Sequence, residues 1–152
     1  MSAHVSATVD ETRALGARLA QLLRAGDLIV LDGALGAGKT ALTQGIGAGL
    51  GVPGPVVSPT FVIARVHRGG RVPLVHVDAY RLASTVEVDD LDLDVDAVDA
   101  VTVVEWGQGL VEQLAGEWLL VSIARDAQSD ERALTLTPHG GDWAERLAAA
   151  GL

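Results

Sequence analysis

The sequence predicts one α/β domain with a mixed central sheet and flanking helices, and three patterns carry this prediction. An apolar run at 28–31 is followed by a glycine-rich segment and by apolar residues at helical spacing over 40–50. Two strand-like runs, 61–66 and 72–77, flank a turn with two glycines, which favours an antiparallel hairpin inserted after the first βα unit. A length of 152 residues suits a single domain spanning 1–152.

The other elements alternate between helix and strand in the same way. Thr8 can cap a first helix that carries an apolar stripe of leucines and ends by Gly26. Gly51 and the prolines that follow it end the helix at 40–50. The patterns then predict a buried strand at 101–104, a short helix at 108–114, paired strands at 119–123 and 133–136, and a closing helix at 142–152 with Asp142 as its cap.

Residues 33–40 read Gly-Ala-Leu-Gly-Ala-Gly-Lys-Thr and match the phosphate-binding loop pattern G-x-x-x-x-G-K-[ST] in full. Glycines let such a loop wrap backbone N–H groups around an anion, and the helix that follows adds its N-terminal dipole. Lys39, the only lysine of the chain, would reach the β- and γ-phosphates, and the Thr40 hydroxyl would coordinate Mg²⁺. We therefore expect a P-loop NTPase-like domain. The alternative is a glycine-rich turn with a solvated surface lysine.

Other classes of function are disfavoured. The run Gly45-Ile46-Gly47 is not a dinucleotide fingerprint, because Leu50 stands where that pattern requires glycine. With 20 acidic and 11 basic residues the net charge is −9, whereas a protein that grips DNA or RNA by its phosphates shows a basic patch. Apolar stretches fall far short of the roughly 20 residues that span a membrane. No export signal follows Met1, and we expect a cytoplasmic protein, where ATP is available.

The absence of cysteine excludes disulfides and thiolate metal sites. Acidic residues crowd between Glu87 and Asp99. We interpret this segment as solvated or partner-facing rather than as a calcium loop, because Ala97 stands where such a loop needs glycine.

Two apolar runs lead directly into carboxylates. The run at 72–77 ends at Asp78, and the run at 101–104 ends at Glu105, so each places an acid at the end of a strand. Ligands of open α/β sheets bind at this edge. Either acid could complete a Mg²⁺ site or orient a water toward the γ-phosphate, and either alone could be an ordinary strand-end charge. His76 is interpreted as an ordinary strand-end histidine and is left out of the catalytic set.

Four motifs together resemble the TsaE family, small ATPases that act in the synthesis of threonylcarbamoyladenosine on tRNA. They follow one another in the family's order over about residues 8–115. The motifs are Gly-Ala-Leu-Gly-Ala-Gly-Lys-Thr (33–40), Ser58-Pro59-Thr60-Phe61, His76-Val77-Asp78-Ala79-Tyr80-Arg81 and Val104-Glu105-Trp106.

The resemblance implies roles for individual residues. Thr40 and Glu105 match the Mg²⁺ ligands of the family, and Asp78 matches a carboxylate needed for hydrolysis. Thr60 falls in a segment that resembles a γ-phosphate sensor, and Trp106 matches an aromatic beside the nucleotide. The candidate catalytic residues are therefore Lys39 and Asp78, the metal ligands are Thr40 and Glu105, and the nucleotide-binding set is Gly33, Leu35, Gly36, Ala37, Gly38, Lys39, Thr40, Ala41, Thr60 and Trp106.

By the same resemblance we expect a Mg-ATP-dependent ATPase that is slow alone and is stimulated by its partners, the TsaD and TsaB proteins. It would contact tRNA only indirectly and would not transfer the threonylcarbamoyl group itself. Ala41 departs from the family, where a second threonine is common, and so lacks one hydroxyl that could donate to a phosphate. The alternative is a small P-loop kinase, which would need an acceptor pocket and an arginine-bearing lid. A guanine-reading switch is excluded, because its motif needs a second lysine.

Overall fold

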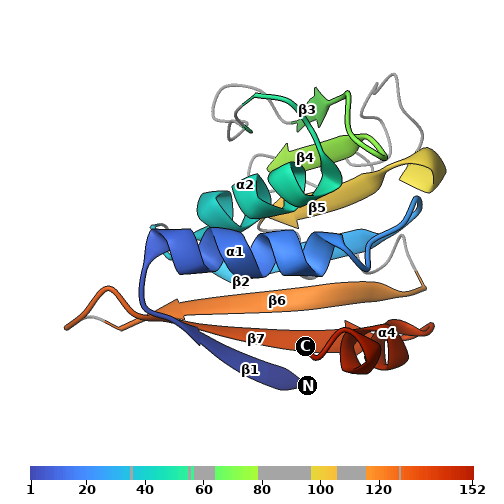
Figure 1. The fold of residues 1–152 in the computed structure, drawn as a ribbon. Helices are drawn as coiled ribbons and strands as arrows, with labels where there is room; N and C mark the ends of the chain where they lie inside the picture. The colour runs from blue at the N-terminus through green and yellow to red at the C-terminus, as the bar shows by residue number, and fades with distance from the viewer. Residues whose placement is uncertain (35, 55, 57–63, 79–96, 106–115, 127) are drawn as a thin grey trace.

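The computed structural model describes residues 1–34, 36–54, 56, 64–78, 97–105, 116–126 and 128–152. The fold is of the mixed α/β class, as predicted (Figure 1). Its elements are, in chain order, β1 (Ser2–Ser6), α1 (Val9–Ala20), β2 (Leu28–Gly33), α2 (Lys39–Leu50), β3 (Ala64–His67), β4 (Leu74–Asp78), the 3₁₀ turn η2 (Ala97–Asp99), β5 (Val101–Glu105), β6 (Trp118–Arg125), β7 (Arg132–His139) and α4 (Trp143–Ala149).

The described strands form one seven-stranded sheet in the order β1-β7-β6-β2-β5-β4-β3. Strands β4, β5, β2 and β6 are parallel, whereas the pairs β1/β7, β6/β7 and β3/β4 are antiparallel. The predicted hairpin after the β2–α2 unit and the predicted pairing of β6 with β7 are confirmed. The carboxyl ends of the four parallel strands meet at one edge of the sheet, which we call the carboxyl edge. The predicted strand start at 61–63, the predicted helix at 108–114 and most of the acidic segment lie outside the described residues.

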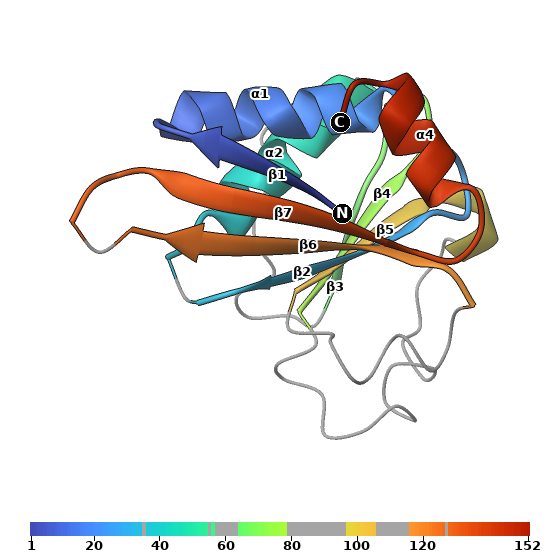
Figure 2. The same ribbon diagram turned by 90° about the horizontal axis from the view of Figure 1, so that it is seen from below.

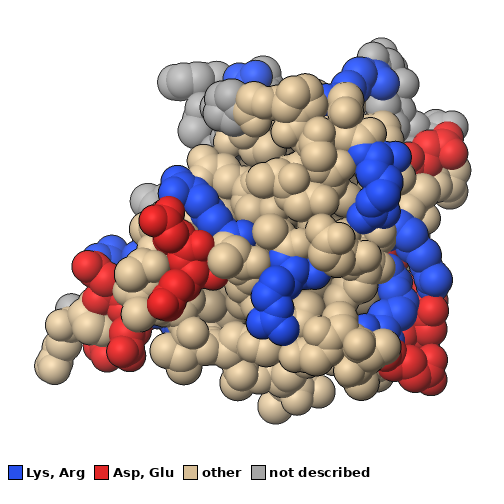
Figure 3. Space-filling view, in the orientation of Figure 1, with Lys and Arg blue, Asp and Glu red and all other residues tan. Residues whose placement is uncertain are grey.

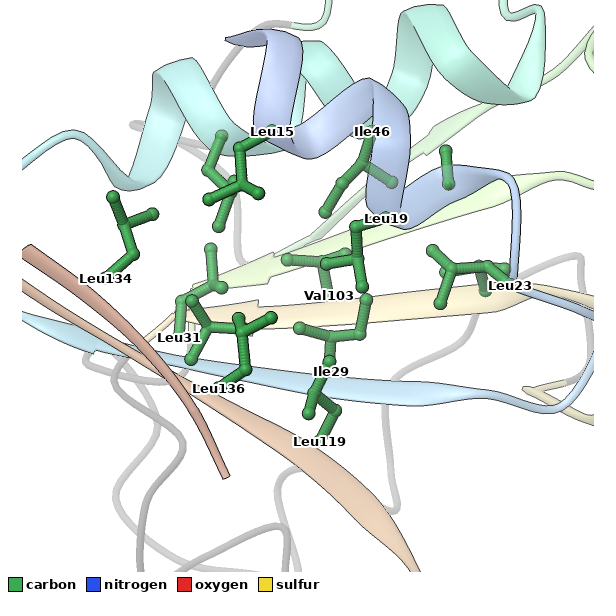
Figure 4. Packing of buried hydrophobic residues seen from close by; sticks show 14 of the residues in the cluster. Leu15, Leu19, Leu23, Ile29, Leu31, Ile46, Val103, Leu119, Leu134 and Leu136 are labelled. Atoms are coloured by element: carbon green, nitrogen blue, oxygen red, sulfur yellow. The ribbon is translucent and has the colours of Figure 1, made fainter. Parts of the chain in front are cut away.

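Helices α1, α2 and α4 cover one face of the sheet (Figure 2). Side chains alternate across each strand, so Ile29 and Leu31 of β2 face the larger core under the helices, and Val30 faces a smaller cluster on the other side. Figure 4 shows leucines of α1 and Ile46 of α2 meeting side chains of β2, β5, β6 and β7. Each fully buried side chain of this kind contributes about 2 kcal/mol. No helix in the described part of the chain is long and apolar enough to cross a membrane.

Glycines let α2 lie unusually close to α1. A Cβ atom at Gly45 would lie 2.0 Å from the Arg13 carbonyl oxygen, and one at Gly16 would lie 2.4 Å from the Leu42 carbonyl oxygen. Each glycine weakens an isolated helix by about 1 kcal/mol relative to alanine, yet here only glycine fits. The predicted helix over 40–50 is confirmed, and its contact with α1 fixes where the preceding loop leads into it.

The first helix ends earlier than predicted. Thr8 caps α1 as expected, but the helix stops at Ala20 instead of continuing toward Gly26. At this end the Arg71 guanidinium donates hydrogen bonds to the carbonyls of Ala20 and Leu23, at 2.7 and 2.8 Å. A side chain from the β3–β4 connection therefore supplies the donors that further helical turns would have provided.

Both ends of the chain differ from the sequence prediction. Strand β1 was not predicted; it pairs antiparallel with β7 at the edge of the sheet. Asp142 precedes α4 as predicted, but its side chain makes no capping hydrogen bond. Its carboxylate instead accepts two hydrogen bonds from Arg24, at 2.7 and 2.8 Å, and so ties α4 to the segment after α1.

Some basic side chains of this view lie beside acidic ones, at the left and lower right, whereas others near the centre are surrounded by uncharged residues (Figure 3). Arg13 contacts Asp10 at 3.2 Å, and Arg24 contacts Asp142 at 2.7 Å. Exposed pairs of this kind contribute little to stability, about 0–1 kcal/mol. They do, however, balance the positive charge of these two arginines.

Candidate nucleotide-binding site

Residues 33–40, which we call the phosphate loop, connect β2 to α2 at the carboxyl edge. The Ala37 N–H donates to the Ala34 carbonyl at 3.0 Å, which closes a tight turn. Gly36 and Gly38 have φ angles of +80° and +116°, in the left-handed region where any side chain is strained. The backbone therefore requires glycine at these two positions of the predicted motif.

Helix α2 begins in this loop without a side-chain cap. Its N-cap is Gly38, and no acidic residue occurs in its first turn. The first N–H groups of a helix have no partner within the helix, and they carry the positive end of its dipole. This combination favours the binding of an anion.

Lys39 is folded across the loop and is only 6% exposed. Its Nζ atom donates to the Gly33 carbonyl at 2.6 Å. Burial lowers the pKa of the Lys39 ammonium, and the nearby carboxylates of Glu105, Asp32 and Asp78 oppose this shift. The alternative of a solvated surface lysine is therefore wrong. A buried ammonium costs folding free energy, which points to a role other than stability.

The two predicted strand-end acids lie on neighbouring strands. Asp78 of β4 and Glu105 of β5 are partners in the parallel register, and Glu105 is also the partner of Leu31 in β2. Glu105 is 5% exposed. The expectation that both acids lie at the strand ends beside the phosphate loop is confirmed, because β4 and β5 end at Asp78 and Glu105 and β5 pairs with β2, which leads into the loop.

His76 holds the Glu105 carboxylate. The imidazole is completely buried, and its Nε2 atom lies 2.7 Å from Oε2 of Glu105. Donation from His76 to this carboxylate requires the imidazole tautomer that carries its proton on Nε2. The interpretation of His76 as an ordinary strand-end histidine misses this contact. Local sequence patterns do not reveal this contact, because 29 positions separate His76 from Glu105.

Asp32, which the sequence analysis did not single out, is the third acid near Lys39. It stands at the end of β2, directly before the first glycine of the phosphate loop. Leu35, Thr60 and Trp106 lie outside the described residues, so their proposed contacts stay predictions.

The two predicted Mg²⁺ ligands, Thr40 and Glu105, lie on elements that meet this edge of the sheet. Among the described residues, no three His, Cys, Asp or Glu side chains are grouped so that they could hold a metal. Mg²⁺ in phosphate sites takes only one or two protein oxygens and completes its shell with phosphate oxygens and water. Thr40 lies in the first turn of α2 and Glu105 at the end of β5, and their role as Mg²⁺ ligands stays a prediction.

Comparison with known proteins assigns the family. The family model for the threonylcarbamoyl adenosine biosynthesis protein TsaE matches residues 6–134. The chain belongs to the TsaE family. The match includes the phosphate loop and both strand-end acids, Asp78 and Glu105. The resemblance drawn from the four motifs is thereby confirmed.

Several TsaE proteins are close relatives over most of their length. The protein named tRNA threonylcarbamoyladenosine biosynthesis protein TsaE in Streptomyces coelicolor is 58% identical over 138 residues, which cover 87% of this chain and 93% of the relative. The protein of that name in Mycobacterium leprae is 52% identical over 136 residues, 84% of either chain. The one in Bacillus subtilis is 42% identical over 135 residues, 88% of this chain and 84% of the relative.

The fold is also found in a solved structure. The crystal structure of YdiB from Bacillus subtilis matches with a TM-score of 0.78 and 30% sequence identity. The match covers 99% of this chain and 93% of that chain. The arrangement of sheet and helices described above is therefore similar to that of YdiB.

Proposed function

We propose that this TsaE family member binds Mg-ATP at the carboxyl edge of its sheet and hydrolyses it in the service of tRNA threonylcarbamoyladenosine biosynthesis. The observation that carries the proposal is Lys39, a buried ammonium folded over a glycine loop at the uncapped N-terminus of a helix. Each of these features favours an anion, and together they match the demands of a triphosphate.

The chain supplies the phosphate site from its backbone and one side chain. The N–H groups at the start of α2 would donate to phosphate oxygens. Lys39 Nζ, which donates to the Gly33 carbonyl in the structure, would exchange that acceptor for oxygens of the β- and γ-phosphates. Because the donors are already held in place by the fold, little reorganisation is needed when charge develops on the phosphates.

Thr40 and Glu105 would hold Mg²⁺, which neutralises charge on the β- and γ-phosphate oxygens when it is bound. His76 acts on Glu105 through the 2.7 Å hydrogen bond from Nε2 and fixes the direction of the carboxylate. Residues that orient a metal ligand in this way typically affect metal affinity by about 10- to 100-fold. His76 is thus a positioning residue of the proposed site.

Asp78 would orient the water that attacks the γ-phosphate. Its place beside Glu105, at the end of the neighbouring strand, puts its carboxylate at the same edge as the phosphate loop. A carboxylate there can accept a hydrogen bond from the water and later its proton.

We propose further that hydrolysis serves a complex with the TsaD and TsaB proteins in the cytoplasm, and that tRNA is met only through this complex. The net charge of −9 supports docking to basic protein surfaces and disfavours a direct grip on tRNA phosphates. The chain alone would then turn over ATP slowly.

The test is steady-state phosphate release from ATP by the chain alone and after addition of its cognate TsaD and TsaB proteins, with Lys39→Ala as the control. We expect strong stimulation that is absent in the Lys39→Ala variant. Equal release with and without the two proteins would contradict the proposed partnership. Equal release by the Lys39→Ala variant would contradict the proposed site.

A further inference from the structure

Arg132, the first residue of β7, contacts the phosphate loop from outside. Its Nε atom donates to the Ala37 carbonyl at 2.8 Å, and its Nη1 atom donates to the Asp130 carbonyl at 2.6 Å. The side chain is half-buried, and a Cβ atom at Gly38 would lie 3.7 Å from Arg132 Nε. The guanidinium is therefore held by its own hairpin at one end and by the phosphate loop at the other.

This contact determines the orientation of one peptide group in the loop. The peptide between Ala37 and Gly38 is trans, so its C=O and N–H point in opposite directions. Because the carbonyl points to Arg132, the Gly38 N–H points away from β7. In the described part of the chain no acceptor takes a hydrogen bond from this N–H. It is therefore available to an anion on the other side of the loop.

We propose that Arg132 is a positioning residue of the phosphate loop. Its hydrogen bond holds the Ala37–Gly38 peptide so that the Gly38 N–H donates to a nucleotide phosphate. The inference rests on the proposed function, because it assigns a role within the same site. The hydrogen bond from a cationic donor also polarises the peptide and strengthens its N–H as a donor. Sequence spacing does not reveal this contact, because 95 positions separate the two residues.

Arg125 provides a matched control. It is the cross-strand partner of Arg132 in the β6–β7 hairpin, so it carries the same charge at nearly the same place. Its guanidinium is half-exposed and contacts Asp130 at 3.4 Å. It makes no hydrogen bond to the phosphate loop among the described residues.

The test measures the dissociation constants of ADP and ATP, each with Mg²⁺, for the parent chain and for Arg132→Ala, Arg132→Lys and Arg125→Ala. Arg132→Lys keeps the charge but has no Nε–H. We expect both Arg132 variants to weaken ADP and ATP by about tenfold, and Arg125→Ala to bind as the parent does. Lys39→Met, in which we expect nucleotide binding to be lost, serves as the reference for a failed site.

A second readout needs no nucleotide. The amide resonance of Gly38 in the free protein should shift in Arg132→Lys and stay in place in Arg125→Ala, which separates positioning from a loss of folding. Full affinity in Arg132→Lys would overturn the proposal in favour of simple charge attraction, and full affinity in Arg132→Ala would overturn it outright. If the parent chain itself bound neither nucleotide, the proposed function would fail rather than the role of Arg132.

Discussion

Charged side chains are buried at the carboxyl edge of the central sheet and at the opposite edge, where the parallel strands begin. We call this opposite edge the amino edge, and the hydrogen bonding of the charged groups differs between the two. At the amino edge, the Asp27 carboxylate accepts from the Arg24 N–H at 2.8 Å and from Nη1 of Arg146 at 3.1 Å, with a further bond from Nη2. Arg146 also donates to the Leu22 carbonyl and lies 4.3 Å over the Trp143 ring. This network joins α4, the segment after α1 and the start of β2.

The carboxyl edge combines buried charged groups with an open helix N-terminus. The N-terminus of α2 lacks a side-chain cap, and the Nδ1 atom of the buried His76 has no partner among the described residues. Lys39 is held at a lowered pKa by burial. A buried ion pair with its hydrogen bonds made supports the fold, whereas titratable groups perturbed by burial cluster at functional sites. We therefore expect substitutions at the two edges to affect different properties.

The largest expected effect is on catalysis at the carboxyl edge. Replacing Asp78 by Ala removes the group proposed to orient water, so we expect phosphate release to fall by about 100-fold or more. The dissociation constant of Mg-ATP should change by less than about threefold, because Asp78 is not proposed to hold the nucleotide. Single-turnover hydrolysis together with equilibrium binding measures both properties. Undiminished turnover would transfer the water-orienting role to another residue.

At the amino edge the expected effect is on stability. Arg146→Met leaves the Asp27 carboxylate buried without its main partner, which costs about 3 kcal/mol. For a chain of this length that lowers the melting temperature by roughly 6–12 °C. Thermal unfolding measures the loss, and Arg125→Met, an exposed arginine, is the control with little expected change. If Arg146→Met weakened Mg-ATP binding tenfold in the folded protein, the division of roles between the edges would be wrong.

Substitutions of His76 test whether its hydrogen bond to Glu105 supports Mg²⁺ binding. His76→Leu removes the donor to Glu105, and we expect the Mg²⁺-dependent part of ATP affinity to fall by about tenfold. His76→Gln can still donate from its amide nitrogen and should restore most of that affinity. Binding of ATP is measured with and without Mg²⁺ for each variant. The same loss in both variants, or a loss that is independent of Mg²⁺, would contradict the positioning role.

The smallest effect is expected at the Arg24–Asp142 pair, on the amino side of the molecule. The hydrogen bond and charge of Arg24 lower the pKa of the Asp142 carboxyl below its ordinary value of 3.8. A lowered pKa adds stability above the ordinary pKa, and this stability is lost as pH falls through the lowered value. Asp142→Asn should therefore melt slightly below the parent at neutral pH, and the gap in melting temperature should close as pH falls through the lowered pKa of Asp142. Thermal unfolding of both proteins from neutral to acidic pH measures this difference in melting temperature. A difference that widens in acid would contradict the stabilising role of the Arg24–Asp142 pair.

Local sequence patterns predicted those parts of the fold that depend on neighbouring residues. The phosphate loop, the helix after it, the β3–β4 hairpin and the strand-end positions of Asp78 and Glu105 all follow from glycine placement and apolar periodicity. The early end of α1 did not follow, because its terminal carbonyls are bonded by Arg71, some 50 positions away.

The missed features of the site are also contacts between distant residues. His76 meets Glu105 across 29 positions, and Arg132 meets Ala37 across 95. Strand β1 forms because β7 offers an edge to pair with, although Ser2–Ser6 shows little intrinsic strand preference. Asp142 could have capped α4 from its own backbone position, but Arg24 provides a charged partner. In each case a contact between residues far apart in the sequence determines the local structure.

The central claim is that the buried Lys39 ammonium at the carboxyl edge serves nucleotide binding rather than stability. The most direct test is thermal unfolding of the parent and of Lys39→Met, each with and without Mg-ATP. Methionine removes a charge whose burial is unfavourable, so without nucleotide we expect the variant to melt within about 2 °C of the parent or above it. Mg-ATP should raise the melting temperature of the parent and leave that of the variant unchanged. An equal rise in both proteins would contradict the account.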